Sequence, residues 1–164
     1  MEIWDLHCHL AGVPGRTPEE RLGKMLEYAD RMGIARLCVY MGLEWAYDPT
    51  PEKLRQDNDE VLRAIRRYPD RAFGFVYLNP KLPQASLDEL NRCVADGPMV
   101  GVKLWVAQRC NAPELDPIIA RAVWPAVPHR PSGRPRRTGR ARSGARPAGV
   151  RPFPSSAQAP ASVE

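Results

Sequence analysis

The stretch Asp5-Leu6-His7-Cys8-His9 (DLHCH, residues 5–9) decides how the rest of this 164-residue sequence is interpreted. Apolar residues flank it, and the glycines and proline of residues 12–15 follow as a loop signal, which predicts a strand over residues 2–10. Successive side chains of a strand point to opposite faces of the sheet. The expected faces are Asp5, His7 and His9 on one side, and Trp4, Leu6 and Cys8 on the other.

His7 and His9 are the candidate metal ligands. Neutral imidazole binds zinc and similar divalent ions, and two imidazoles two residues apart at a strand end can hold one ion. The alternative is a pair of histidines that only form hydrogen bonds at the end of the strand. Asp5 either orients one of the imidazoles or simply closes the base of the strand. Cys8 is expected to pack against a helix, because it points away from the pair.

Four strands, each followed by a helix, are predicted along residues 1–123. Thr17 and Thr50 each precede a proline as N-cap residues, and Ser86 with Glu89 matches a capping box. Strand–helix units of about 30 residues predict a parallel sheet with right-handed crossovers. The expected strands are residues 2–10, 34–41, 72–78 and 99–106, and the expected helices begin after Thr17 and Thr50, at Ser86 and at Pro113.

Two architectures fit this α/β pattern: the N-terminal half of a TIM-like (β/α)8 barrel, and an open doubly wound sheet. The first loop has no G-x-G-x-x-G motif, which argues against a dinucleotide-binding sheet. A metal pair at the end of the first strand favours the barrel, whose active sites lie at the carboxyl ends of the strands. We therefore expect four βα units of a barrel over residues 1–123. Glu44, Trp45 and Asn79 fall in loops on that side and are candidates to line a substrate pocket.

The composition changes abruptly at residue 124. Residues 1–123 carry a net charge of −2, whereas residues 124–164 carry eight arginines, one acidic residue and a net charge of +7. Eight prolines, seven alanines and four glycines in this tail predict disorder, because such a segment cannot bury enough apolar surface. A reading-frame shift near codon 124 is our hypothesis for its origin. His129 is a poor third metal ligand, because the prolines around it disfavour a central strand.

Several classes of protein are disfavoured by the sequence. No apolar run is long enough for a transmembrane helix, and the N-terminus lacks the basic and apolar regions of a secretory signal. The four cysteines form no CxxC pair, so reduced thiols and a cytoplasmic location are expected. The basic tail contains no recognisable nucleic-acid-binding module, so neither nucleic acid nor membrane is expected as a partner.

Three motifs resemble the metal-dependent amidohydrolase superfamily, in particular its amidohydrolase-related branch, which also contains decarboxylases. The resemblance covers residues 1–123 and is absent from the tail. Its most specific element is the D-x-H-x-H pattern on an N-terminal strand. The motifs are Asp5-Leu6-His7-Cys8-His9, Asn79-Pro80 after the third strand, and Gly101-Val102-Lys103-Leu104 on the fourth.

The resemblance implies a (β/α)8 barrel with one or two divalent metal ions, most commonly zinc, bound by His7 and His9. Further ligands in the family come from the fifth, sixth and eighth strands, which this sequence does not supply. Lys103 stands near the position of a carboxylated lysine that bridges two metals in some members, and it is the candidate catalytic residue. Many members of this branch make no such use of a lysine. The implied chemistry is a metal-activated water that attacks a C–N or ester bond of a small-molecule substrate.

Three functions are compatible with these observations. The first is a metal-dependent hydrolase, the second is a metal-dependent decarboxylase of the same superfamily, and the third is a non-catalytic fragment. Because only four βα units are expected, we predict a truncated chain that carries part of an active site. Its open sheet edges predict marginal stability, aggregation or a homo-oligomer.

Overall fold

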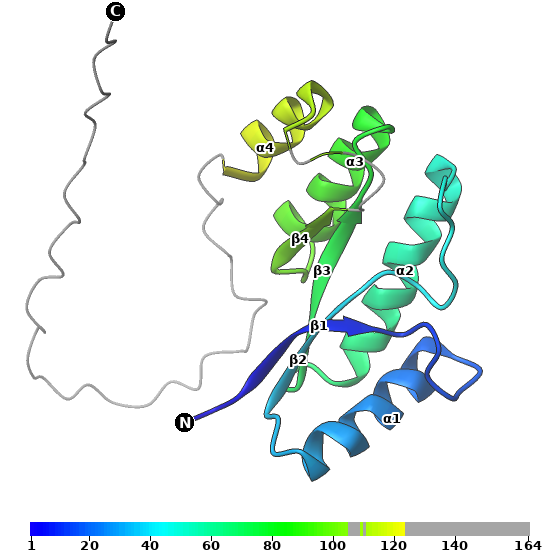
Figure 1. Ribbon diagram of the computed structural model, residues 1–164, viewed down its shortest axis with the longest axis vertical. Coiled ribbons are helices and arrows are strands. Elements are labelled where there is room, and N and C mark those ends of the chain that lie inside the picture. The colour runs from blue at the N-terminus through cyan, green and yellow to red at the C-terminus, as the bar shows by residue number, and fades with distance from the viewer. Residues whose placement is uncertain (105–108, 110, 124–164) are drawn as a thin grey trace, which may run out of the picture. The chain divides into compact units, whose positions relative to one another are not determined.

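A computed structural model of the chain describes residues 1–104, 109 and 111–123. Its sheet contains β1 (Trp4–His9), β2 (Arg36–Tyr40), β3 (Ala72–Leu78) and β4 (Gly101–Leu104). All neighbouring pairs are parallel, and the order in the sheet is β1-β2-β3-β4 (Figure 1). A doubly wound sheet reverses its strand order, whereas a barrel keeps the order of the chain. The N-terminal half of a (β/α)8 barrel is therefore the observed fold class, as predicted.

Helices follow each strand as expected. The two threonine caps are confirmed, because Thr17 Oγ1 and Thr50 Oγ1 accept hydrogen bonds from the backbone N–H groups of Glu20 and Lys53 at 3.2 and 3.3 Å. The predicted tail and the predicted end of the fourth strand lie outside the described residues. The helices are α1 (Pro18–Arg31), α2 (Pro51–Arg67), α3 (Pro83–Leu90) with a π-helical turn at Asn91–Ala95, a 3₁₀ turn at Pro113–Leu115 and α4 (Asp116–Val123).

The start of α3 differs from the prediction. The helix begins at Pro83, one turn before Ser86, so Ser86 is not its N-cap. Ser86 is instead buried, where its hydroxyl donates to the carbonyl oxygen of Asn79 at 2.8 Å and accepts from the N–H of Asn79 at 3.0 Å. The physical reason is a tertiary one: the hydroxyl satisfies a backbone that leaves the sheet at the end of β3, and this bond replaces the local capping box.

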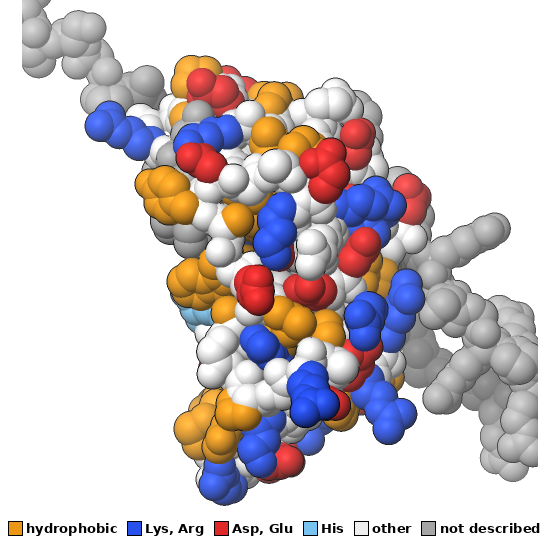
Figure 2. Space-filling model, turned by 90° about the vertical axis from the view of Figure 1, so that its right-hand side faces the viewer, with side chains coloured by type: hydrophobic (Ala, Val, Ile, Leu, Met, Phe, Trp, Pro, Cys, Tyr) orange, Lys and Arg blue, Asp and Glu red, His pale blue; other side chains and the backbone are white. Residues whose placement is uncertain are grey.

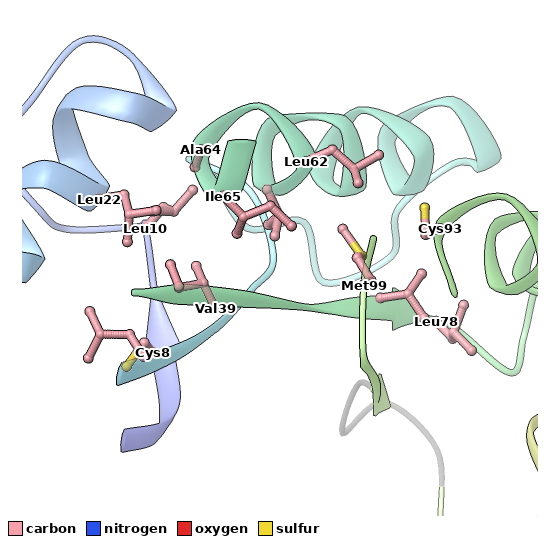
Figure 3. Packing of buried hydrophobic residues seen from close by; sticks show 14 of the residues in the cluster. Cys8, Leu10, Leu22, Val39, Leu62, Ala64, Ile65, Leu78, Cys93 and Met99 are labelled. Carbon is pink, nitrogen blue, oxygen red and sulfur yellow. The ribbon is translucent and has the colours of Figure 1, made fainter. Parts of the chain in front are cut away.

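The main core lies between the sheet and its helices, on what we call the outer face of the sheet. Leu62, Ala64 and Ile65 of α2 lie above Val39 and Leu78 of the strands (Figure 3). Gly74 allows this close approach, because a Cβ atom there would lie 3.0 Å from Ile65 and 2.9 Å from Met99. We call the opposite side of the sheet the inner face.

The solvent side of the helices is polar. On the face shown in Figure 2, lysine and arginine side chains alternate with aspartate and glutamate side chains over small apolar areas. Such mixed charge is typical of a solvated helix surface. Within the described part of the chain, no helix has the length and hydrophobicity needed to cross a membrane.

A buried amide joins α2 to the end of β3. The register between β2 and β3 ends at Val39 opposite Gly74. Beyond it, Asn58 Oδ1 accepts from the N–H of Tyr77 at 2.8 Å, and Asn58 Nδ2 donates to the carbonyl oxygen of Tyr77 at 3.1 Å. The same Nδ2 donates to Glu89 Oε2 on α3 at 2.9 Å. Asn58 therefore continues the pairing of β3 where β2 has ended.

We predict that Asn58→Ala destabilises the chain by about 2 kcal/mol or more, because it removes the two buried hydrogen bonds to the backbone of Tyr77 and one of those to Glu89 Oε2. The free energy of unfolding is measured by urea denaturation of both proteins. Gln56→Ala on the same helix is the matched control, since its exposed amide bonds only Glu60 among the described contacts. Equal losses in the two variants would contradict the structural role of Asn58.

Candidate functional site

One extra residue in β1 sets the direction of its side chains. Asp5 pairs with Leu37 and Cys8 pairs with Val39, so Leu6 and His7 together lie opposite Cys38. This is a β-bulge, and it changes the phase of the alternation. The N–H of His7 donates to Asp5 Oδ1 at 2.9 Å, which satisfies a backbone donor that the bulge takes out of regular pairing.

The bulge makes part of the predicted alternation wrong. Trp4 shares the inner face with the histidines, because its ring stacks on Phe73 at 5.1 Å and lies under the Arg36 guanidinium at 5.0 Å. Asp5 is level with Leu37, which belongs to the core on the outer face. It therefore acts on the backbone of the bulge, and among the described contacts it bonds no imidazole nitrogen.

The rings of His7 and His9 converge. Their Nε2 atoms are 3.0 Å apart, and their ring centroids are 4.9 Å apart. Two nitrogens that bind one tetrahedral zinc ion lie about 3.3 Å apart, since each Zn–N bond is about 2.0–2.1 Å. The separation also suits a hydrogen bond from one ring to the other. The distance between the two Nε2 atoms is therefore compatible with two positions of a zinc site.

The surroundings of His9 favour its neutral form. Burial lowers the pKa of His9, and the nearby His7 and Lys103 lower it further, while the backbone of Tyr40 opposes them. Neutral imidazole is the form that binds a metal. His9 Nδ1 is buried and has no hydrogen-bond partner of ordinary geometry among the described residues.

Cys8 lies in the core, as predicted. It is 5% exposed and belongs to the cluster between the sheet and the helices. Burial, followed by the charge of Asp5, raises the pKa of the Cys8 thiol to about 12. Because Cys8 lies in this core, on the face opposite the histidine pair, its position argues against ligation of the same ion.

Lys103 reaches the same face as the histidines. It pairs with Tyr77 in the register of β4, and its Nζ lies 4.9 Å from the centroid of the Tyr40 ring. A cation over an aromatic face is a favourable contact. Lys103 is therefore brought to the candidate site as an ammonium group beside the histidine pair.

Two aromatic rings were not predicted as close neighbours of the pair. Tyr40, at the end of β2, lies 5.4 Å from the His7 ring and 4.7 Å from the His9 ring. Trp45, in the loop after β2, lies 5.1 Å from the His9 ring, and its place in a pocket lining stays a prediction. The signal for Tyr40 was available in the sequence, since the last residue of the second strand faces the end of the first.

The other loop candidates, Asn79 and Glu44, are not brought beside the histidine pair among the described contacts. Asn79 is 1% exposed and its side chain accepts from the backbone of Lys81, so it shapes the turn and does not line a pocket. None of the described contacts joins Glu44 to the histidines, and His129 lies outside the described residues. Among the residues that the structure describes, no third histidine, cysteine or carboxylate joins His7 and His9 to form a metal-binding group. The described site is thus a two-nitrogen clamp.

Comparison with known proteins identifies the fold. No protein-family model matches the sequence, and no curated protein does either. Solved structures do match: 2,6-dihydroxybenzoate decarboxylase from Rhizobium has 24% sequence identity and a TM-score of 0.52 over 74% of this chain and 46% of that one. The same decarboxylase complexed with 2,6-dihydroxybenzoate matches with 23% identity and a TM-score of 0.51 over 73% of this chain and 45% of that one.

A protein from Staphylococcus aureus assigned as an amidohydrolase matches with 18% identity and a TM-score of 0.58, over 74% of this chain and 44% of that one. This chain therefore spans less than half the length of the structures it matches. Identities of this size establish a shared fold, so the resemblance inferred from the motifs is confirmed at the level of the fold, by one structure of a decarboxylase and one of an assigned amidohydrolase. The likeness does not distinguish hydrolysis from decarboxylation.

Proposed function

We propose that the chain belongs to the amidohydrolase superfamily and carries the first half of a metal-dependent hydrolase site. The observation that supports this most directly is the convergence of His7 Nε2 and His9 Nε2 to 3.0 Å on the inner face. The pair stands at the carboxyl end of a barrel strand, where active sites of this fold lie. Zinc is the metal that we propose, because imidazole nitrogens suit it and the pair matches its geometry.

The roles of the residues follow from their positions. His7 and His9 hold the metal, and burial lowers the pKa of His9, which favours the neutral ring that binds a metal. When bound, a divalent metal supplies an activated water and polarises the carbonyl of a C–N or ester substrate. Tyr40 and Trp45 place aromatic rings against the clamp, at 4.7 and 5.1 Å from the His9 ring.

Decarboxylation of a small carboxylic acid is the second candidate. It is favoured by Lys103, whose ammonium lies on the inner face near the clamp and is able to attract the carboxylate of a substrate. One of the similar structures is a decarboxylase complexed with 2,6-dihydroxybenzoate, a small carboxylic acid, and this likeness supports the same candidate. A non-catalytic fragment is the third candidate, since a catalytic zinc usually has three protein ligands and the described residues supply two.

We predict that the full chain binds zinc through the clamp. Loss of even an outer partner of a ligand costs about 10–100-fold in metal affinity, so His7→Ala or His9→Ala should weaken zinc binding by more than about tenfold. Isothermal titration with Zn²⁺ measures the dissociation constant. His129→Ala is the matched control, because it also removes one histidine, and it should leave the constant unchanged. Equal affinity in all four proteins would refute the clamp.

The reaction is tested on the zinc-loaded chain. We expect hydrolysis of a simple activated ester that is lost in His9→Ala, because the clamp holds the catalytic ion. Release of CO₂ from 2,6-dihydroxybenzoate without ester hydrolysis would instead favour the decarboxylase. Zinc binding with neither reaction would leave the non-catalytic fragment. Both rates are followed by absorbance and CO₂ detection on the same preparation.

Substitution of Lys103 tests whether the chain binds one metal ion or two. An ammonium near the clamp repels a cation, so Lys103→Met should raise the zinc affinity severalfold and leave one ion per chain. A carboxylated lysine that bridges two ions predicts the opposite, a fall in affinity and in metal content. Titration together with elemental analysis separates these results. We expect the first, because Lys103 Nζ lies over the Tyr40 ring as a cation does.

A further inference from the structure

Arg21 of α1 joins three backbone segments at the carboxyl ends of β1 and β2. Its Nε donates to the carbonyl oxygen of Gly15 at 3.0 Å. Its Nη1 donates to the carbonyl oxygens of Leu10 at 3.2 Å and Leu43 at 3.1 Å. Leu10 directly follows His9, and Leu43 lies two residues before Trp45. One guanidinium therefore bridges the strand that carries the histidines and the loop that follows β2.

Glu60 of α2 holds the same loop from the other helix. Its Oε2 accepts from the N–H of Leu43 at 2.6 Å. Gly42 lies against this carboxylate, because a Cβ atom there would overlap Glu60 Oε2 and Asp57 Oδ1. The peptide groups on both sides of Leu43 are thus fixed by charged side chains, the carbonyl by Arg21 and the N–H by Glu60.

The backbone before this point is turned sharply. Met41 has a φ of 61°, in the left-handed region that a side chain other than glycine seldom occupies, and it is 1% exposed. Such a conformation persists only where surrounding contacts determine it. The hydrogen bonds from Arg21 and to Glu60 at Leu43 restrain the backbone just after Met41. The chain then continues to Trp45 beside the His9 ring.

We propose that Arg21 and Glu60 are positioning residues that together hold Trp45 against His9, so that its indole forms a fixed wall of the clamp. The proposal concerns the placement of Trp45, and it rests on the proposed function only in calling that place the wall of a metal site. A fixed indole beside His9 gives a flat apolar surface, which suits a planar apolar part of a substrate next to the metal position.

The placement is tested in the metal-free full chain by NMR. A nuclear Overhauser effect between the indole protons of Trp45 and the ring protons of His9 reports their contact. We expect it in the unmodified chain and in the control Arg31→Gln, since Arg31 on the same helix lies over the Tyr28 ring. We expect its loss in Arg21→Gln, and a persistent signal in a folded Arg21→Gln protein would overturn the proposal.

Glu60 provides a second pair of variants, for the case that Arg21→Gln does not fold. Glu60→Ala removes the acceptor of the Leu43 N–H, and we expect the Trp45–His9 signal to disappear. Glu60→Gln keeps a carbonyl oxygen that is able to accept this bond, and we expect the signal to be restored. Retention of the signal in Glu60→Ala, or its loss in both variants alike, would contradict a positioning role.

Copper titration separates this proposal from the metal site. In a chain whose other tryptophans are replaced by phenylalanine, Cu²⁺ at the clamp should quench Trp45 fluorescence. In Arg21→Gln we expect Cu²⁺ to bind with similar affinity and to quench severalfold less. Equal quenching at equal affinity would overturn the positioning role. Absence of copper binding in every protein would refute the metal site, while the metal-free NMR result still decides the placement of Trp45.

Discussion

One extra residue in β1 governs the geometry of this site. A regular strand pairs Asp5 with Leu37 and His7 with Val39, but the bulge brings Cys8 opposite Val39 instead. Cys8 consequently enters the core, and His9 emerges level with Tyr40 on the inner face. The cost of the bulge is an N–H removed from the ladder, and Asp5 offsets it by accepting that hydrogen bond. The aspartate of the D-x-H-x-H motif thus supports the histidines through the backbone.

Local signals in the sequence were sufficient for most of the fold. The Thr17 and Thr50 caps depend on residues within three positions, so the sequence predicts α1 and α2 correctly. Ser86 has the same local signature, yet its hydroxyl bonds Asn79 across the turn after β3, and α3 begins one turn earlier. The bulge was missed for a similar reason. It is defined by how β1 pairs with β2, and the sequence of β1 alone carries no sign of it.

The juxtaposition of His7 and His9 was predictable from the sequence, whereas the aromatic rings beside them were predicted only in part. His7 and His9 stand two residues apart, and this spacing survives the bulge because the extra residue lies before or at His7. Tyr40 and Trp45 depend on how β2 and its loop sit beside β1, which no residue spacing within one strand encodes. The contacts of Arg21 cross 11 and 22 positions of the sequence, so they become visible only when α1 packs on the sheet.

Charge sets the chemistry that such a clamp favours. A divalent ion held by His7 and His9 would keep its double charge, because imidazole binds a metal in its neutral form, and Lys103 lies on the same face. Since no carboxylate joins the pair among the described residues, an ion held there would attract an anion strongly at its remaining positions. Hydroxide and a substrate carboxylate are the two small anions that meet this demand. On our proposal the first anion would serve hydrolysis and the second decarboxylation, so the same electrostatic feature would underlie both candidate reactions.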